Sequence, residues 1–119
     1  MQTRKFSLNN IAEFQWQRHR FSLCNLNNSF VFITGGRDKK GEPCADCERL
    51  SVTQNTVDNM PDLEVPRMYL STCAQGTSIF AICGYGVDEK TGKRVSFNTI
   101  ERLSNAINQA DLIEDWEVI

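Results

Sequence analysis

The stretch FSLCNLNNSFVFITGG, residues 21–36, decides the fold of this 119-residue chain. It begins with a short segment that carries serine and cysteine, and it ends in the continuous apolar run 30–34 and a glycine pair. β-branched and aromatic residues bounded by glycine predict a β-strand. Polar alternation is expected where one face of a sheet meets water, so its absence indicates a strand that is covered on both faces.

A second copy of this pattern lies 49 residues further along the chain. Alignment of the two stretches places Arg18 on Arg67, and it places Gly35 on Gly84. The tetrapeptide ERLS also occurs twice, 53 residues apart, and four extra residues in the polar loop before the second copy account for the larger spacing. The sequence therefore predicts a repeat of about 50 residues.

Each repeat is expected to contain four strands. The serine- and cysteine-bearing segment forms the first strand, the apolar run forms the second, the residues around ERLS form the third, and a fourth follows. The predicted strands are 21–24, 30–34, the residues around 48–51 and 55–58 in the first unit, and 70–74, 79–83, the residues around 100–103 and 114–118 in the second. Four-stranded antiparallel sheets that cover one another face to face are the blades of a β-propeller. The predicted fold class is all-β.

These motifs resemble the kelch family of β-propellers. The resemblance is carried by the apolar strand with its glycine pair (FVFITGG), the third-strand motif ERLSV and the arginine that opens the next unit (PRM). It covers nearly the whole chain and implies kelch-type blades, each a four-stranded antiparallel meander, at residues 18–58 and 67–119. Residues 1–17 would be the remnant of a preceding blade, with Trp16 as its fourth-strand aromatic residue.

The chain departs from the kelch pattern at several positions. Leu50 and Thr56 stand where the family usually has a tyrosine and a tryptophan, and Trp116 follows Leu103 by 13 residues. In the second unit, Gly84-Tyr85-Gly86 replaces the glycine pair. By resemblance, the structural residues of the motif are Gly35, Gly36, Gly84, Gly86 and Trp116.

The length of the chain sets the number of blades. Closed propellers contain about 4 to 8 blades, whereas 119 residues provide little more than two repeats. We therefore expect an incomplete propeller, whose remaining blades come from a longer chain or from a homo-oligomer.

Composition and charge limit the partners of the chain. Its formal net charge is −2, and its apolar and charged fractions of 40% and 24% are those of a soluble globular domain. Without an excess of clustered Lys and Arg, we expect no nucleic-acid partner. No apolar stretch has the length of a signal-peptide core or of a membrane-spanning helix. We therefore expect no membrane association, reduced cysteines and a cytoplasmic location.

Catalytic and metal-binding patterns are incomplete. Cys44 and Cys47 have the C-x2-C spacing of half a zinc site, but no second ligand pair follows, and His19 is the only histidine. The segment 86–94, GVDEKTGKR, differs from the phosphate-binding loop and is expected to form a β-hairpin turn at Thr91-Gly92. We therefore predict no metal, no cofactor and no enzyme activity. The alternatives are a fragment of a galactose oxidase-like propeller enzyme and a structural pair of blades that oligomerises.

The remaining prediction is a protein-binding surface made of loops. In an antiparallel meander, the loop between the second and third strands opens on the same edge as the segment that leads to the next unit. Long charged side chains on this edge would form a docking rim for a protein partner. The predicted contact residues are Arg18, Arg37, Lys39, Lys40, Arg67, Lys90, Lys93 and Arg94, with Asp38, Glu42, Met68 and Asp88 on the same rim. The resemblance implies an adaptor that recruits substrates to ubiquitin ligases, or a binder of cytoskeletal proteins.

Overall fold

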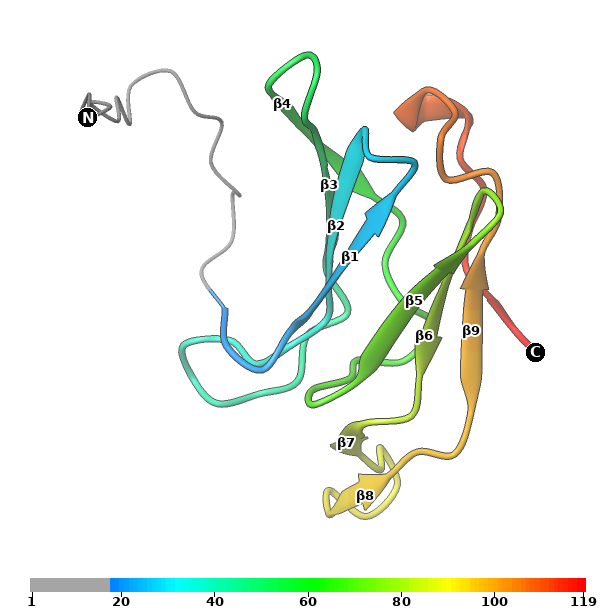
Figure 1. The fold of residues 1–119 in the computed structure, drawn as a ribbon. Coiled ribbons are helices and arrows are strands. Elements are labelled where there is room, and N and C mark those ends of the chain that lie inside the picture. The colour runs from blue at the N-terminus through cyan, green and yellow to red at the C-terminus, as the bar shows by residue number, and fades with distance from the viewer. Residues whose placement is uncertain (1–17) are drawn as a thin grey trace, which may run out of the picture.

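The computed structural model describes residues 18–119 and confirms an all-β chain (Figure 1). Within these residues the strands form two four-stranded antiparallel sheets and one two-stranded hairpin. The expected blade remnant at residues 1–17, with Trp16, lies outside the described residues.

The two large sheets contain the predicted strands, with ends that differ by a few residues. The first sheet has the order β1-β2-β3-β4, and the second has the order β10-β9-β6-β5. The first consists of β1 (Ser22–Leu26), β2 (Phe30–Thr34), β3 (Cys47–Ser51) and β4 (Thr56–Met60). The second consists of β5 (Ser71–Gln75), β6 (Ser78–Ile82), β9 (Ile100–Leu103) and β10 (Glu117–Val118). The inserted elements are the hairpin of β7 (Tyr85–Val87) and β8 (Arg94–Ser96), and the short 3-10 helix η2 (Ala110–Leu112) between β9 and β10.

The two sheets pack face to face around a shared core. Phe32 and Met60 of the first sheet and Ile79 of the second belong to one cluster of buried side chains, whose removal from water stabilises the pair. Where β1 and β5 run side by side, Ser22 Oγ lies 2.7 Å from Thr72 Oγ1. Each sheet therefore has one face in this core and one outer face.

The second unit repeats the strand pairing of the first, with a shift that the sequence alignment missed. Phe32 lies opposite Arg49 in the first sheet, and Phe80 lies opposite Arg102 in the second. Phe80 is thus the counterpart of Phe32, 48 rather than 49 residues later. The cause is a shorter turn, because three residues separate β1 from β2 and two separate β5 from β6. The alignment at 49 residues therefore matched side chains from opposite faces of the second strand, since successive side chains alternate.

The shift also reassigns the glycine pair. Gly35 and Gly36 correspond to Cys83 and Gly84, so the expected match of Gly84 with Gly35 is wrong. All four residues have positive φ, at 64°, 111°, 58° and 96° in that order. A Cβ atom on Gly36 or on Gly84 would lie 2.7 or 2.8 Å from a carbonyl oxygen of the neighbouring segment. Glycine is required at these two positions because only its hydrogen fits such a close approach of two backbones.

The connection between β9 and β10 is longer than its counterpart between β3 and β4 and covers part of the first sheet. Ala106 in this connection is fully buried in the shared core. Trp116, just before β10, is also buried, and its Nε1 donates a hydrogen bond of 2.9 Å to the carbonyl oxygen of Pro61. Trp116 therefore ties the end of the second unit to the segment that joins the two sheets.

Candidate functional site

Arg18, which we expected on the exposed rim, is buried in the first unit. Its Nη2 donates to Glu48 Oε1 at 2.6 Å, and the side chains of this ion pair are 1% and 0% exposed. Its Nη1 donates to the carbonyl oxygens of Gly35 and Asp46 at 3.2 and 2.5 Å. Glu48 is the first residue of the first ERLS.

Arg67 repeats this arrangement in the second unit. Its Nε donates to Glu101 Oε2 at 2.9 Å, and neither side chain of the pair is exposed. Its Nη1 donates to the carbonyl oxygens of Cys83 and Thr99 at 2.9 and 3.0 Å. These are the counterparts of the two carbonyl acceptors in the first unit, so the same hydrogen-bond network occurs twice.

The two networks explain why an arginine and ERLS recur together. A buried guanidinium needs a carboxylate and further acceptors, because an unpaired charge in the interior is costly. The side chains of Arg18 and Arg67 are therefore not exposed on the rim. Each one fastens the segment before a first strand to the third strand of the same sheet, and so positions the exposed residues that follow it.

The loops that we expected to share one edge lie together (Figure 1). The β2–β3 loop, the residues that lead into β5 and the β7–β8 hairpin lie at the bottom of the view. We call this edge the loop rim. The predicted contact residues that are exposed on it are Arg37, Lys39, Lys40, Lys90, Lys93 and Arg94.

Two of the rim carboxylates shape their own loops. Asp38 Oδ1 accepts hydrogen bonds from the backbone N–H groups of Lys40 and Glu42 at 2.8 and 2.9 Å. Asp88 Oδ1 accepts one from the backbone N–H of Lys90 at 2.8 Å. Hydrogen bonds from the following backbone N–H groups to an aspartate stabilise turns. The main role of these carboxylates is therefore to stabilise the conformation of their own loops.

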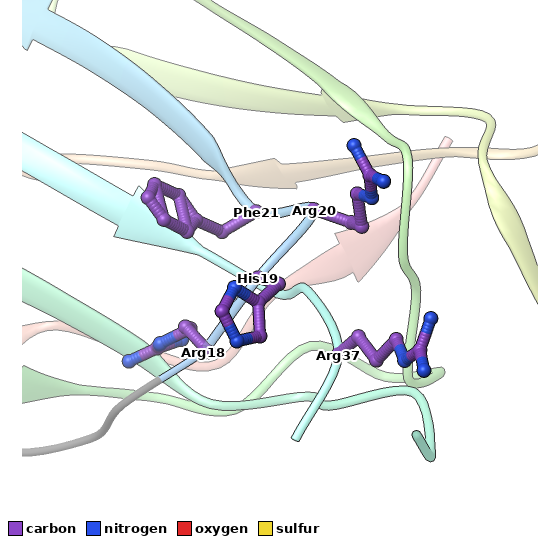
Figure 2. Close-up of a pocket in the computed structure, with 5 residues that line it drawn as sticks. All are labelled: Arg18, His19, Arg20, Phe21 and Arg37. Carbon is purple, nitrogen blue, oxygen red and sulfur yellow. The ribbon is translucent and has the colours of Figure 1, made fainter. Parts of the chain in front are cut away.

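A hollow of about 610 Å³ opens on the loop rim beside the start of β1. It is lined by Arg18, His19, Arg20, Phe21 and Arg37. His19 and Arg37 exchange two backbone hydrogen bonds of 2.9 and 2.6 Å, which fix both residues at the edge. In Figure 2, Arg20 and Arg37 point to the same side, away from Arg18 and Phe21. We call this feature the basic hollow.

A second hollow, of about 290 Å³, belongs to the second unit. Its lining residues are Met68, Tyr69, Tyr85, Arg94, Val95 and Ser96. Tyr69 and Tyr85 are 51% and 48% exposed, and their rings meet edge to face with centroids 6.0 Å apart. We call this feature the aromatic hollow.

The two hollows are built on the same backbone. Met68 and Tyr85 exchange two backbone hydrogen bonds of 2.8 Å, as the corresponding pair does in the basic hollow. Arg20 and Tyr69 correspond as well, with φ of 57° and 56°, and Tyr69 N–H donates to the carbonyl oxygen of Arg20 at 2.9 Å. One repeated scaffold therefore presents cations in the first unit and aromatic rings in the second.

Sequence reasoning missed Arg20, Tyr69 and Tyr85 as site residues. Arg20 and Tyr69 each follow the buried arginine of their unit by two positions, which is the one signal that the sequence contains. Their left-handed backbone is uncommon for bulky residues. The surrounding backbone hydrogen bonds impose this left-handed conformation. The residue types at positions 20 and 69 therefore gave no reason to predict it.

The β7–β8 hairpin confirms the turn that we expected at Thr91-Gly92. Gly92 has φ of 67°, and its N–H donates to the carbonyl oxygen of Asp88 at 2.7 Å. Gly86 is not part of a glycine pair. A Cβ atom there would lie 2.3 Å from the ring of Phe97, so Gly86 allows that ring to pack against the hairpin.

The cysteines of the C-x2-C motif face the interior. Burial raises the pKa of Cys47 to about 12. Burial, followed by the charges of Asp38 and Asp46, raises the pKa of Cys44. Among residues 18–119, no group of three or more His, Cys, Asp or Glu side chains is arranged to hold a metal ion.

No protein-family model and no curated protein gives a significant match to this sequence. Among residues 18–119, no helix has the length and apolar character to cross a membrane.

Proposed function

We propose that the chain forms two blades of a kelch-type β-propeller and acts as a non-catalytic module that binds a protein partner through the loop rim. The observation that carries this proposal is the exposure of Tyr69 and Tyr85 on the rim, with Arg20 in contact with the Tyr69 ring. Tyrosine and arginine are enriched among the residues that contribute most to protein–protein affinity. Here they stand on strand ends that are held by backbone bridges, so little conformational entropy is lost on binding.

The propeller arrangement is supported by the outer face of the first sheet. Leu23 on this face is 56% exposed. Val31, Leu50 and Val57 lie side by side across β2, β3 and β4 on the same face, and they are only half-buried. A row of neighbouring apolar side chains is the surface that another sheet covers in a repeat protein.

The outer face of the second sheet has the same character. Phe80, Ile82 and Ile100 are half-buried there. Arg102 on this face forms an ion pair with Glu117, as Arg49 does with Asp58 in the first sheet. Because Arg49 contacts the neighbouring sheet of this chain, we propose that Arg102 contacts a further blade, supplied by a longer chain or by another copy.

Site-specific photocrosslinking tests the rim. The photoreactive residue p-benzoylphenylalanine would replace Lys93 on the loop rim in one variant. In a matched variant it would replace Gln54, which is exposed in the β3–β4 turn at the opposite edge. In cells that express the protein, we expect one discrete protein adduct from the Lys93 position and none from the Gln54 position. Adducts from Gln54 alone, or from neither position, would contradict the proposal.

A further inference from the structure

We infer that the loop rim binds an extended acidic segment of its partner, with a carboxylate in the basic hollow and an aromatic or proline ring two residues away in the aromatic hollow. This inference rests on the proposed function and names the chemistry of the partner.

The basic hollow carries unneutralised positive charge. Arg20 and Arg37 are exposed, and within the described residues neither of them forms an ion pair. The remaining lining cation, Arg18, is neutralised by Glu48. No carboxylate lines either hollow within residues 18–119. In Figure 2 the guanidinium groups of Arg20 and Arg37 point to the same side but lie apart, so each one offers its own planar donor pair to a carboxylate.

A protein carboxylate fits the charge of the chain better than a nucleic acid does. The chain has a net charge of −2, and the loop rim also contains the acidic residues Asp38, Glu42 and Asp88. A polyanion needs an extended basic surface to release its counterions. A local pair of arginines within a mixed rim instead suits single carboxylates on a peptide.

Arg20 joins the two hollows. Its Cζ lies 5.2 Å from the centroid of the Tyr69 ring, which is the distance of a cation–π contact. A guanidinium that lies over a ring keeps its edge N–H groups free for a carboxylate. A peptide acid bound to Arg20 would therefore lie next to the aromatic hollow.

The distances set the spacing of the peptide motif. The centroids of the Tyr69 and Tyr85 rings lie 6.0 Å apart, and Arg20 Cζ lies 5.2 Å from the Tyr69 centroid. In an extended chain, side chains two residues apart point to the same side at a separation of about 7 Å. A peptide with an acidic residue and a ring-bearing residue two positions apart, in either order, would therefore reach both hollows at once.

The backbone supports a role for these side chains beyond packing. Arg20 and Tyr69 have positive φ, a conformation that is unfavourable for residues with a Cβ atom. Strained residues of this kind occur preferentially at binding sites. Both side chains are exposed at the same structural position of successive units, so the strain places them on the rim rather than in the core.

Selection from a phage library of random dodecapeptides, with the full chain as the immobilised target, tests the inference. We expect enrichment of Asp or Glu two residues from Phe, Trp, Tyr or Pro. Binding of a selected peptide should weaken at least tenfold in the double variant Arg20→Gln and Arg37→Gln, and it should weaken with rising salt. Tyr85→Ala should remove the preference for a ring and keep the preference for an acid. Gln54→Glu, which changes the net charge by the same amount as one Arg→Gln substitution but lies at the opposite edge, should leave the affinity unchanged.

Three results would overturn the inference while leaving the docking rim intact. The first is failure to select any peptide, and the second is selection of peptides without an acid at this spacing. The third is equal affinity of a selected peptide for the double variant and for the native chain. In each case the docking rim stands if the Lys93 position still crosslinks to a partner. A phosphoserine peptide that binds where the glutamate peptide does not would identify a phosphopeptide partner and would also overturn it. Selected peptides that crosslink from Gln54 and not from Lys93 would refute the proposed function itself. Circular dichroism of each variant would show that its fold is retained.

Discussion

Arg49 donates a hydrogen bond of 2.8 Å from Nη1 to the carbonyl oxygen of Ala106, across the interface between the two sheets. The same nitrogen donates to the carbonyl oxygen of Asn108 at 2.6 Å. Its counterpart Arg102 lies on the outer face of the second sheet, where its side chain is 39% exposed and paired with Glu117. Arg49 thus joins one sheet to the next, and Arg102 occupies the equivalent position on a face that the described residues 18–119 leave partly exposed.

Replacement of Arg49 by methionine should lower the free energy of unfolding by about 1.5–3 kcal/mol, the usual loss for hydrogen bonds to a charged group. The aliphatic side chain keeps the contact with neighbouring apolar atoms but loses both bonds to the β9–β10 connection. The matched variant Arg102→Met should cost at most about 1 kcal/mol, because its ion pair is exposed. Urea denaturation of both variants measures the difference, and equal losses would show that Arg49 does not join the sheets.

Glu101→Gln should destabilise the protein far more than a surface substitution of the same type. The change leaves Arg67 in the interior without its carboxylate, which typically costs about 3–5 kcal/mol. The control is Glu117→Gln, whose side chain is 58% exposed, and it should cost at most about 1 kcal/mol. Chemical denaturation that gives similar values for the two variants would contradict the buried network.

Cys83→Gly should stabilise the protein. Cys83 has φ of 58°, and a left-handed conformation costs a residue with a Cβ atom about 1–2 kcal/mol. The greater freedom of glycine in the unfolded chain offsets about 0.5–1 kcal/mol of that gain. A net increase of up to about 1.5 kcal/mol in the free energy of unfolding is therefore expected. Gly84→Ala is the opposite case and should destabilise by more than about 1 kcal/mol, because the new Cβ meets a carbonyl oxygen at 2.8 Å. Thermal denaturation that ranks the two changes in the reverse order would refute this account of the turn.

The cysteines should differ sharply in their rates of alkylation. Cys73 and Cys83 are exposed, whereas Cys47 is 3% exposed and has its pKa raised to about 12 by burial. Alkylation requires the thiolate, so at pH 8 roughly one Cys47 side chain in 10⁴ would be reactive even if reagent reached it. Mass spectrometry after a short iodoacetamide pulse should find label on Cys73 and Cys83 and none on Cys47. Early label on Cys47 would show that this part of the core is open.

The same pKa predicts a loss of stability at alkaline pH. The folded protein holds the Cys47 proton more tightly than the unfolded chain, in which the pKa is 9.0. The contribution of this group to stability is therefore complete below pH 9 and is lost as the pH rises towards 12. Cys47→Val should reduce this alkaline dependence in denaturation curves collected across that range. An unchanged slope would show that other groups cause it.

The local sequence pattern predicted where the strands lie. The register of the strands depends on long-range pairing, which the pattern does not contain. The apolar run 30–34 and its glycine pair identified the second strand, and the recurrence of ERLS identified the third. The alignment placed the second strand of the second unit one residue out of register. The turn before that strand is one residue shorter than in the first unit, and the amino-acid composition does not show this. Since strand side chains alternate, that single residue exchanged the two faces of the strand.

The sequence placed the rim cations on one edge but did not separate the exposed ones from the buried arginines. Arg37 and the exposed rim lysines lie on the expected edge. Arg18 and Arg67 looked like surface charges because arginine is seldom fully buried. Their acceptors, a glutamate on another strand and two backbone carbonyl oxygens, become adjacent only when the sheet forms. Tertiary pairing, and not local sequence, therefore separates the internal arginines from the exposed ones.

The register of the second unit is the basis for matching the aromatic hollow to the basic one, and a nuclear Overhauser measurement tests it most directly. The account predicts backbone cross-strand contacts between Phe80 and Arg102, and between Ala81 and Glu101. Contacts between Ala81 and Arg102 as the directly opposed pair would instead restore the spacing of 49 residues. That result would contradict both the repeated network of Arg67 and the correspondence of the two hollows.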